Sequence, residues 1–298
     1  MTVEPAVQFF LDEMAQRATG DMTTMTPDEV RAQYRMQSGM ATGPEMPTSD
    51  TSVPGPAGPI PVRVYEPAGS SADGPTIVWY HGGGWVIGDL ETADPTCRRL
   101  AAATGMRLIS IDYRLAPEHP WPAAPDDCET AAWWLLEHAE AEFGTLRLLI
   151  GGASSGANLA MTTLLRLRDS GQVQPFAGAV LQFGAYDLSG RSPSGQLYAG
   201  EWFITAYAGH VADRTNPDVS PLYGDLRGLP PALLIVGTLD ILLEDTLAMA
   251  ARLSAAGNEV DLRVFPESPH GFTSLPTAMA AAARHGVESW LASRLDEQ

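Results

Sequence analysis

Short apolar runs alternate with longer helix-patterned segments from about residue 62 to the C-terminus. Short apolar runs are typical of strands buried on both faces, and apolar residues that recur every three or four positions are typical of helices. We expect strands at Val62–Tyr65, Thr76–Tyr80, Arg107–Asp112, Leu146–Ile150, Ala177–Phe183, Ala232–Val236 and Asp261–Phe265. We expect helices at Ala93–Ala103, Ala124–Glu142, Ser155–Arg168, Ile241–Ala256 and within Thr277–Leu295. This alternation predicts the α/β class, with a mainly parallel sheet covered by helices on both faces.

Two segments do not follow the alternation. Residues 1–45 are helix-like and precede the first expected strand, and residues 188–216 follow the strand expected to end at Phe183. Insertions at the C-terminal ends of parallel strands overhang the ligand crevice, so we expect the two segments to form a cap together. Residues 46–187 and 217–298 would then be the two parts of one compact core. Its first stretch, Met46 to Pro61, is rich in proline and glycine and is expected to be irregular.

The charge balance narrows the range of partners. The formal net charge is −18, which leaves no basic surface for nucleic acid or for an anionic membrane, so neither is expected as a partner. The N-terminus lacks a basic stretch followed by a long apolar one, and no run approaches the roughly 20 apolar residues of a membrane span. We therefore expect a soluble, cytoplasmic protein. Cys97 and Cys128 have no metal-type spacing, so we expect two reduced, partly buried thiols and no metal site.

A serine lies between two glycines in Gly152-Ala153-Ser154-Ser155-Gly156, between an expected strand and an expected helix. A Gly-x-Ser-x-Gly turn at such a junction exposes a nucleophilic hydroxyl on a sharp corner. The glycines avoid Cβ atoms that would crowd the strained serine backbone. The spacing selects Ser154 as the candidate nucleophile, although a glycine-rich turn without a catalytic role has the same pattern.

The segment His81-Gly82-Gly83-Gly84-Trp85 directly follows the expected strand Thr76–Tyr80. Consecutive glycines let backbone N–H groups point at a ligand, and such a loop supplies oxyanion-hole donors in α/β-hydrolases. The candidate donors are Gly83, Gly84 and Ser155, the residue after the nucleophile. A phosphate-binding loop is the competing interpretation, but the spacing of phosphate-binding glycine motifs is missing. We expect His81 to order the loop through hydrogen bonds and not to act as the base.

A candidate acid and base follow two later strands. Asp240 comes after the expected strand Ala232–Val236, and His270 comes after Asp261–Phe265. The order serine, acid, histidine is that of the α/β-hydrolases, and the carboxyl ends of parallel strands collect at one edge of the sheet. By itself, Asp240 is equally well explained as an N-cap of the following helix.

Five sequence blocks together resemble the hormone-sensitive-lipase-like branch of the α/β-hydrolases, which includes many bacterial carboxylesterases of family IV. The blocks are HGGGW at 81–85, YRLAPEHPWPAA at 113–124, GxSxGxNLA at 152–160, GTLDILLED around Asp240 and SPHGF at 268–272. The resemblance implies the α/β-hydrolase fold, with a mostly parallel eight-stranded sheet and an α-helical cap. It implies neither a metal nor an organic cofactor. It also implies a triad of Ser154, Asp240 and His270, with Gly83, Gly84 and Ser155 around the oxyanion.

The chain departs from the family pattern at two places. Ala153 stands before the nucleophile where the family usually has an acidic residue, and Ile241-Leu242-Leu243 stands where a proline and an arginine usually follow the acid. We expect these changes to alter tuning or substrate preference and to leave the chemistry in place. In YRLAPEHPWPAA we expect Arg114 and Glu118 to bind one another below the site.

The function predicted from the sequence is that of a serine carboxylesterase acting on small to medium, fairly apolar esters. Aromatic candidates for the pocket wall are Trp85, Tyr186, Trp202, Phe203, Tyr207 and Phe272. The alternative is a receptor-like member of the same fold that binds a small molecule without turnover. The resemblance also allows a homodimer.

Overall fold

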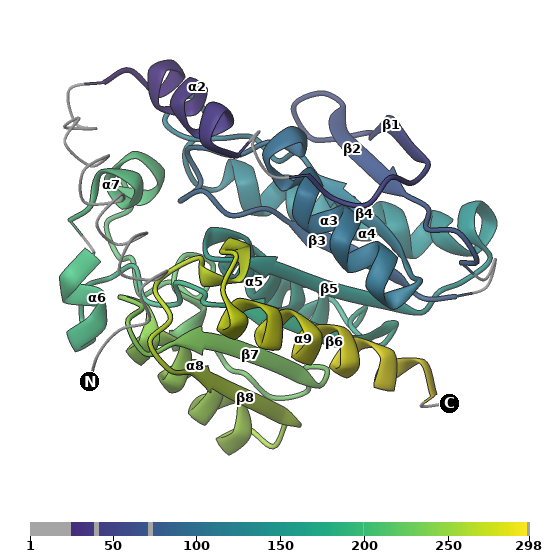
Figure 1. Cartoon of the computed structure of the whole chain (residues 1–298). Coiled ribbons are helices and arrows are strands. Elements are labelled where there is room, and N and C mark those ends of the chain that lie inside the picture. The colour runs from purple at the N-terminus through teal and green to yellow at the C-terminus, as the bar shows by residue number, and fades with distance from the viewer. Residues whose placement is uncertain (1–24, 39–41, 71–73, 199, 297–298) are drawn as a thin grey trace.

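The computed structural model describes residues 25–38, 42–70, 74–198 and 200–296, and its centre is one eight-stranded sheet (Figure 1). The strands lie in the order β1-β2-β4-β3-β5-β6-β7-β8; β1 and β2 are antiparallel to their neighbours, and the other pairings are parallel. Their bounds are β1 Thr48–Val53, β2 Ile60–Tyr65, β3 Thr76–Tyr80, β4 Arg107–Ile111, β5 Leu148–Ala153, β6 Phe176–Gln182, β7 Ala232–Gly237 and β8 Val260–Phe265. The predicted mostly parallel, eight-stranded sheet is confirmed.

Strand β1 was not predicted, and the expectation of an irregular segment over all of Met46 to Pro61 is wrong. This strand, Thr48–Val53, has the sequence TSDTSV, and its side chains are exposed except for Val53. It pairs antiparallel with β2 at the sheet edge, so backbone hydrogen bonding defines it in the absence of any apolar periodicity.

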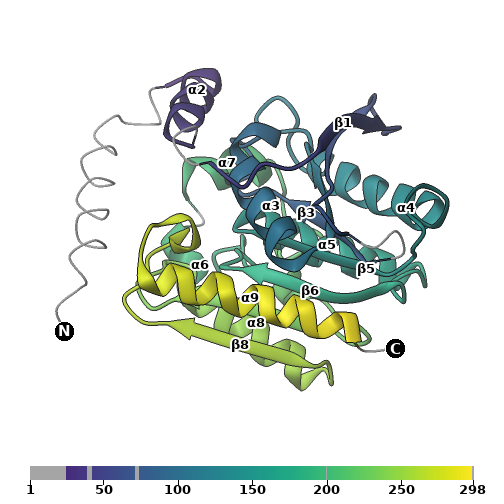
Figure 2. The same cartoon turned by 45° about the vertical axis from the view of Figure 1, so that its right-hand side comes forward.

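Helices cover both faces of the sheet (Figure 2). On one face lie α3 (Leu90–Thr104) and α9 (Ala278–Asp296), and on the other lie α4 (Ala123–Phe143), α5 (Ser155–Asp169) and α8 (Leu243–Ala255). Each face therefore has its own apolar core. This agrees with the near-continuous apolar runs of the parallel strands.

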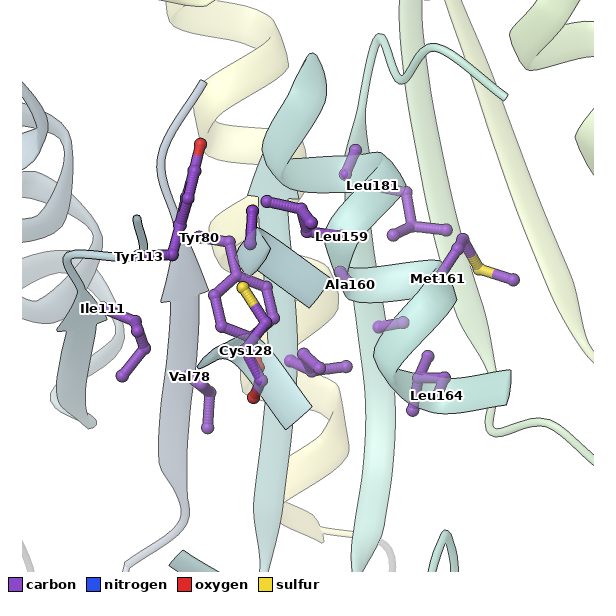
Figure 3. Close-up of a cluster of buried hydrophobic side chains, with 14 of the residues drawn as sticks. Val78, Tyr80, Ile111, Tyr113, Cys128, Leu159, Ala160, Met161, Leu164 and Leu181 are labelled. Carbon is purple, nitrogen blue, oxygen red and sulfur yellow. The ribbon is translucent and has the colours of Figure 1, made fainter. Parts of the chain in front are cut away.

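The apolar core between the sheet and helices α4 and α5 packs against β3, the strand that the glycine loop follows (Figure 3). Tyr80, the last residue of β3, is fully buried, and its hydroxyl donates to the Cys128 carbonyl oxygen at 2.9 Å. Leu159 and Met161 of α5 are buried in the same core. Cys97 and Cys128 are both unbridged, as predicted, and both are fully buried where partial burial was expected.

Three further helices lie on one side of the molecule: α2 (Pro27–Ser38), α6 (Pro193–Tyr198) and α7 (Trp202–Ala208) (Figure 1). Residues 1–24 of the expected N-terminal cap segment lie outside the described residues. The Nε of Arg31 in α2 donates to the Val86 carbonyl oxygen at 2.9 Å, which ties this helix to the loop after β3. Within the described part of the chain, no helix is long and apolar enough to cross a membrane.

Candidate active site

Ser154 occupies a strained corner between β5 and α5. Its φ is 55° and its ψ is −118°, a backbone conformation that residues with a Cβ rarely adopt. A Cβ on Gly152 would collide with the Gly156 backbone, and a Cβ on Gly156 would collide with the Tyr80 carbonyl oxygen. Both glycines are therefore needed for α5 to start so close to β3 and β5.

Ser154, His270 and Asp240 form a hydrogen-bonded chain across the C-terminal edge of the sheet. The Nε2 of His270 lies 3.0 Å from the Ser154 Oγ, and the Nδ1 of His270 lies 2.9 Å and 3.0 Å from the two Asp240 carboxylate oxygens. The Asp240 side chain is 0% exposed, whereas that of His270 is 36% exposed. The buried carboxylate can thus orient an imidazole that a ligand can reach from solvent.

Local packing fixes the two loops that carry the acid and the base. One Asp240 oxygen also accepts the Leu242 N–H at 2.8 Å, in the turn before α8, so Asp240 orders this turn as well as the imidazole. Gly237 ends β7 where the histidine loop crosses it, since a Cβ there would collide with the Ser268 carbonyl oxygen. The edge of the Phe183 ring packs on the His270 ring, with 5.1 Å between their centroids. Gly237 and Phe183 are positioning residues that the sequence analysis did not single out.

The glycine loop lies against the nucleophile corner. A Cβ built on Gly82 would lie 2.9 Å from the Ala153 carbonyl oxygen and 3.5 Å from the Ser154 Cβ. The φ angles of Gly83 and Gly84 are 129° and 58°, in the region that favours glycine. The structure thus brings the predicted loop and the predicted serine together.

His81 is buried beneath this loop. Its Nδ1–H donates to the Gly82 carbonyl oxygen at 2.8 Å, and the Tyr113 hydroxyl donates to the His81 carbonyl oxygen at 2.7 Å. The Tyr113 ring also stacks on the imidazole, with 4.2 Å between the centroids. Burial lowers the pKa of His81 to about 4, so the ring is neutral near pH 7. The predicted loop-ordering hydrogen bonds of His81 are confirmed.

The six aromatic candidates for the pocket wall occupy different environments. Trp85, Tyr186, Tyr207 and Phe272 are buried, and the Trp85 and Tyr207 rings stack with 4.5 Å between centroids. Trp202 and Phe203, both in α7, are partly exposed, and a Cβ on Gly84 would touch the Phe203 ring 2.8 Å away. Phe203 therefore lies beside Gly84 of the loop. Contact of the six aromatic residues with a ligand stays a prediction.

The expected pairing of Arg114 with Glu118 is wrong. Arg114 forms a two-pronged ion pair with the buried Asp127 of α4, with both N···O distances at 2.8 Å, and its backbone N–H donates to the same carboxylate. Glu118 faces the other way and binds Arg31 of α2 at 2.7 Å and 3.0 Å. Asp127 accepts hydrogen bonds from both the backbone N–H and the guanidinium of Arg114. The sequence around Arg114 gives no sign of this double contact.

A buried carboxylate of α8 anchors α6 and the segment that precedes it. Asp245 accepts hydrogen bonds from the Tyr198 hydroxyl at 2.5 Å, from the Ser194 hydroxyl at 3.2 Å and from the backbone N–H groups of Tyr186 and Asp187. Burial raises the pKa of Asp245, and these hydrogen bonds oppose the rise. Asp245 is the last residue of the GTLDILLED block, and its hydrogen-bond partners could not be predicted from that block.

Comparison with known proteins gives one consistent family. A family described as "alpha/beta hydrolase fold" matches residues 77–274. Carboxylic ester hydrolase LipN of Mycobacterium tuberculosis is 38% identical over 295 residues, which are 92% of this chain and 78% of LipN. Ethyl acetate hydrolase of Pseudomonas putida is 33% identical over 304 residues, 95% of each chain. A hyperthermophilic esterase from the archaeon Pyrobaculum calidifontis superposes with a TM-score of 0.89 at 32% identity, over 98% of this chain and 99% of that one.

Proposed function

Since this chain belongs to the hormone-sensitive-lipase-like carboxylesterases of the α/β-hydrolase superfamily, we propose that it hydrolyses carboxylic esters through an acyl-enzyme on Ser154. The observation that carries this proposal is the hydrogen-bonded chain from Ser154 through His270 to Asp240. A hydroxyl within hydrogen-bond reach of an imidazole, itself oriented by a carboxylate, is the arrangement of an activated serine nucleophile.

In the acylation step, the Nε2 of His270 accepts the Ser154 proton while the Oγ attacks the ester carbonyl carbon. Asp240 accepts the Nδ1–H, so it holds the productive tautomer and stabilises the imidazolium. The tetrahedral intermediate then collapses, and His270 returns the proton to the departing alcohol oxygen. Ser154 is left as an ester of the acyl group.

Backbone N–H groups of Gly83, Gly84 and Ser155 are the proposed donors to the negative oxygen of the intermediate. Loss of one such donor costs about 2.7–4 kcal/mol of transition-state stabilisation in other hydrolases. The closeness of Gly82 to Ser154 supports this assignment, because Gly83 and Gly84 follow Gly82 directly in the loop. Water deacylates Ser154 by the same steps, with His270 as the base that activates it.

The proposed substrates are small to medium, fairly apolar esters. Phe203 of α7 lies beside Gly84, and Trp202 packs against Phe203. These partly exposed aromatic rings favour an apolar group. A relative that is 33% identical is named for ethyl acetate, a small ester. We propose that α2, α6 and α7 act as the cap over this site, because they lie on the same side of the molecule (Figure 1).

Hydrolysis of a p-nitrophenyl ester series tests the proposal. Ser154→Ala removes the nucleophile and is expected to reduce kcat for p-nitrophenyl butyrate by several orders of magnitude, about 10⁶-fold at most. Ser170→Ala, at the other end of α5, is the matched control and is expected to keep wild-type activity. Substantial turnover by a folded Ser154→Ala protein would refute the acyl-enzyme assignment.

A further inference from the structure

A pocket lies between α3 and α9. These two helices cover one face of the sheet (Figure 2). The empty space in and in front of the pocket is about 380 Å³, a figure that includes open solvent. Arg99 of α3 and Arg284 of α9 lie in its wall, together with Gln182 at the end of β6. None of the residues proposed for ester hydrolysis lines it.

Neither guanidinium group forms an ion pair with a carboxylate of the described residues. Arg99 donates to the Thr96 hydroxyl at 3.2 Å, and Arg284 donates to the carbonyl oxygens of Thr273 and Leu275 at 2.7 Å and 3.3 Å. Among the described residues, no carboxylate lies within 4.0 Å of either group. Burial and the charge of Arg284 lower the pKa of Arg99. The two positively charged guanidinium groups repel one another, and an anion bound between them would relieve this repulsion.

Two other partly buried arginines are neutralised by carboxylates. Arg63 pairs with Asp50, Glu91 and Asp94, and Arg166 likewise pairs with three carboxylates. The chain has 36 acidic and 18 basic residues, so acidic partners are abundant. Two adjacent arginines without one are therefore unusual for this sequence.

Gln182 adds a neutral donor to the pocket. The residue is 6% exposed, and its side-chain oxygen accepts a hydrogen bond from the Thr273 hydroxyl at 3.1 Å. The amide NH₂ group is then left to bond a ligand in the pocket that Gln182 lines. Two guanidinium groups and an amide offer N–H donors to an anion and match the planar geometry of a carboxylate.

We propose that this pocket binds a short-chain monocarboxylate, with its carboxylate between Arg99, Arg284 and the Gln182 amide. Glu288 also lines the pocket, so the wall carries a net charge of +1, which favours a monoanion over a dianion such as phosphate. Leu100 and Val287 are buried apolar residues of the same wall, and they suit a short alkyl tail.

The pocket is connected to both sides of the candidate active site. The Gln182 carbonyl oxygen accepts the Ser154 N–H at 2.9 Å, and Thr273 follows His270 by three residues. A bound carboxylate fixes the side chains of these connecting residues, so it is expected to change turnover without occupying the substrate site. The expected effect on turnover rests on the proposed function. Ester hydrolysis releases a carboxylic acid, which has the same chemistry as the proposed ligand.

Calorimetric titration with sodium butyrate tests binding directly, with butanamide and sodium chloride as the neutral and salt controls. Butyrate is expected to bind the wild type saturably, and Arg99→Gln and Arg284→Gln are each expected to weaken it by about tenfold or more. Arg227→Gln makes the same charge change at an exposed arginine that pairs with Asp225, and it should bind as the wild type does. Circular dichroism confirms folding, and Arg99→Lys, which keeps the charge, should retain part of the affinity.

Butyrate in the active site would mimic this result, so the titration is repeated on protein with Ser154 blocked by diethyl p-nitrophenyl phosphate. Binding that persists and still depends on Arg99 supports the pocket. Binding that the block abolishes, binding indifferent to both arginine substitutions, or no binding refutes it.

In kinetics with an ester substrate, butyrate should show a non-competitive component that Arg99→Gln removes, and purely competitive inhibition would refute the coupling. Loss of ester hydrolysis as a function would leave the binding result intact, so the two failures are distinguishable.

Discussion

The Nε2 of His270 lies 3.0 Å from the Oγ of Ser154, although 116 residues separate them in the chain. The contact exists because β5 and β8 both end at the same edge of the sheet, and the loops after β5, β7 and β8 converge there. A base poised at this distance has a direct route to the serine proton.

Replacing the buried acid tests how the imidazole is oriented. Asp240→Asn presents an amide to His270 and favours the wrong tautomer, so kcat is expected to fall by about 10⁴-fold with little change in KM. Steady-state kinetics on p-nitrophenyl butyrate measure both values. A loss below tenfold in a folded variant would show that Asp240 serves the turn before α8 and not the imidazole.

A methyl group on the glycine loop should impair the oxyanion site. Gly84→Ala places a Cβ against the Phe203 ring at a residue whose φ is 58°, so the loop must shift and kcat should fall by up to about 10²- to 10³-fold. Part of the loss is steric, and Gly84→Ala combined with Phe203→Ala is expected to recover activity relative to Gly84→Ala. Phe203→Ala alone is the reference for this comparison. If the double variant does not recover activity, the loss of activity in Gly84→Ala comes from the backbone conformation at residue 84.

The Tyr198 hydroxyl stabilises the attachment of α6 to α8. Tyr198→Phe removes a 2.5 Å hydrogen bond to the buried Asp245 carboxylate, and the free energy of unfolding is expected to fall by about 1.5–3 kcal/mol. Urea denaturation measures the change. An unchanged unfolding midpoint would mean that the other donors to Asp245 suffice.

Two neighbouring groups beside the glycine loop should affect acid stability in opposite directions. The pKa of His81 is lowered to about 4, so the unfolded chain takes up this proton first and stability falls between about pH 6.5 and pH 4. Burial, followed by the charge of Asp89, raises the pKa of Asp112 to about 6, so the folded chain takes up that proton first and stability rises as the pH falls toward 3.8. Asp112→Asn removes the rise. The Tm of the variant should therefore drop more than the wild-type Tm between pH 6.5 and pH 4.5. Equal drops would show that Asp112 does not offset the effect of His81.

Features with a local physical signature were predictable from the sequence. Gly152 and Gly156 fix the nucleophile corner by sterics alone, and the buried parallel strands show as apolar runs. The polar edge strand β1 has no such run, and only its pairing with β2 reveals it. The partner of Arg114 was mispredicted because the choice between Glu118 and Asp127 depends on where α4 packs. The Arg99 and Arg284 pocket joins two helices far apart in sequence, so no local pattern indicates it.

The most direct test of the central claim is the site at which a fluorophosphonate modifies the protein. Digestion and tandem mass spectrometry of the labelled protein assign the adduct to a residue, and the neighbouring hydroxyls of Ser154 and Ser155 give distinguishable fragments. The geometry predicts one adduct, on Ser154, formed at a rate that Asp240→Asn lowers in parallel with ester hydrolysis. A folded protein that does not label, as expected of a receptor-like member of the fold, or that labels at Ser155, would contradict the account.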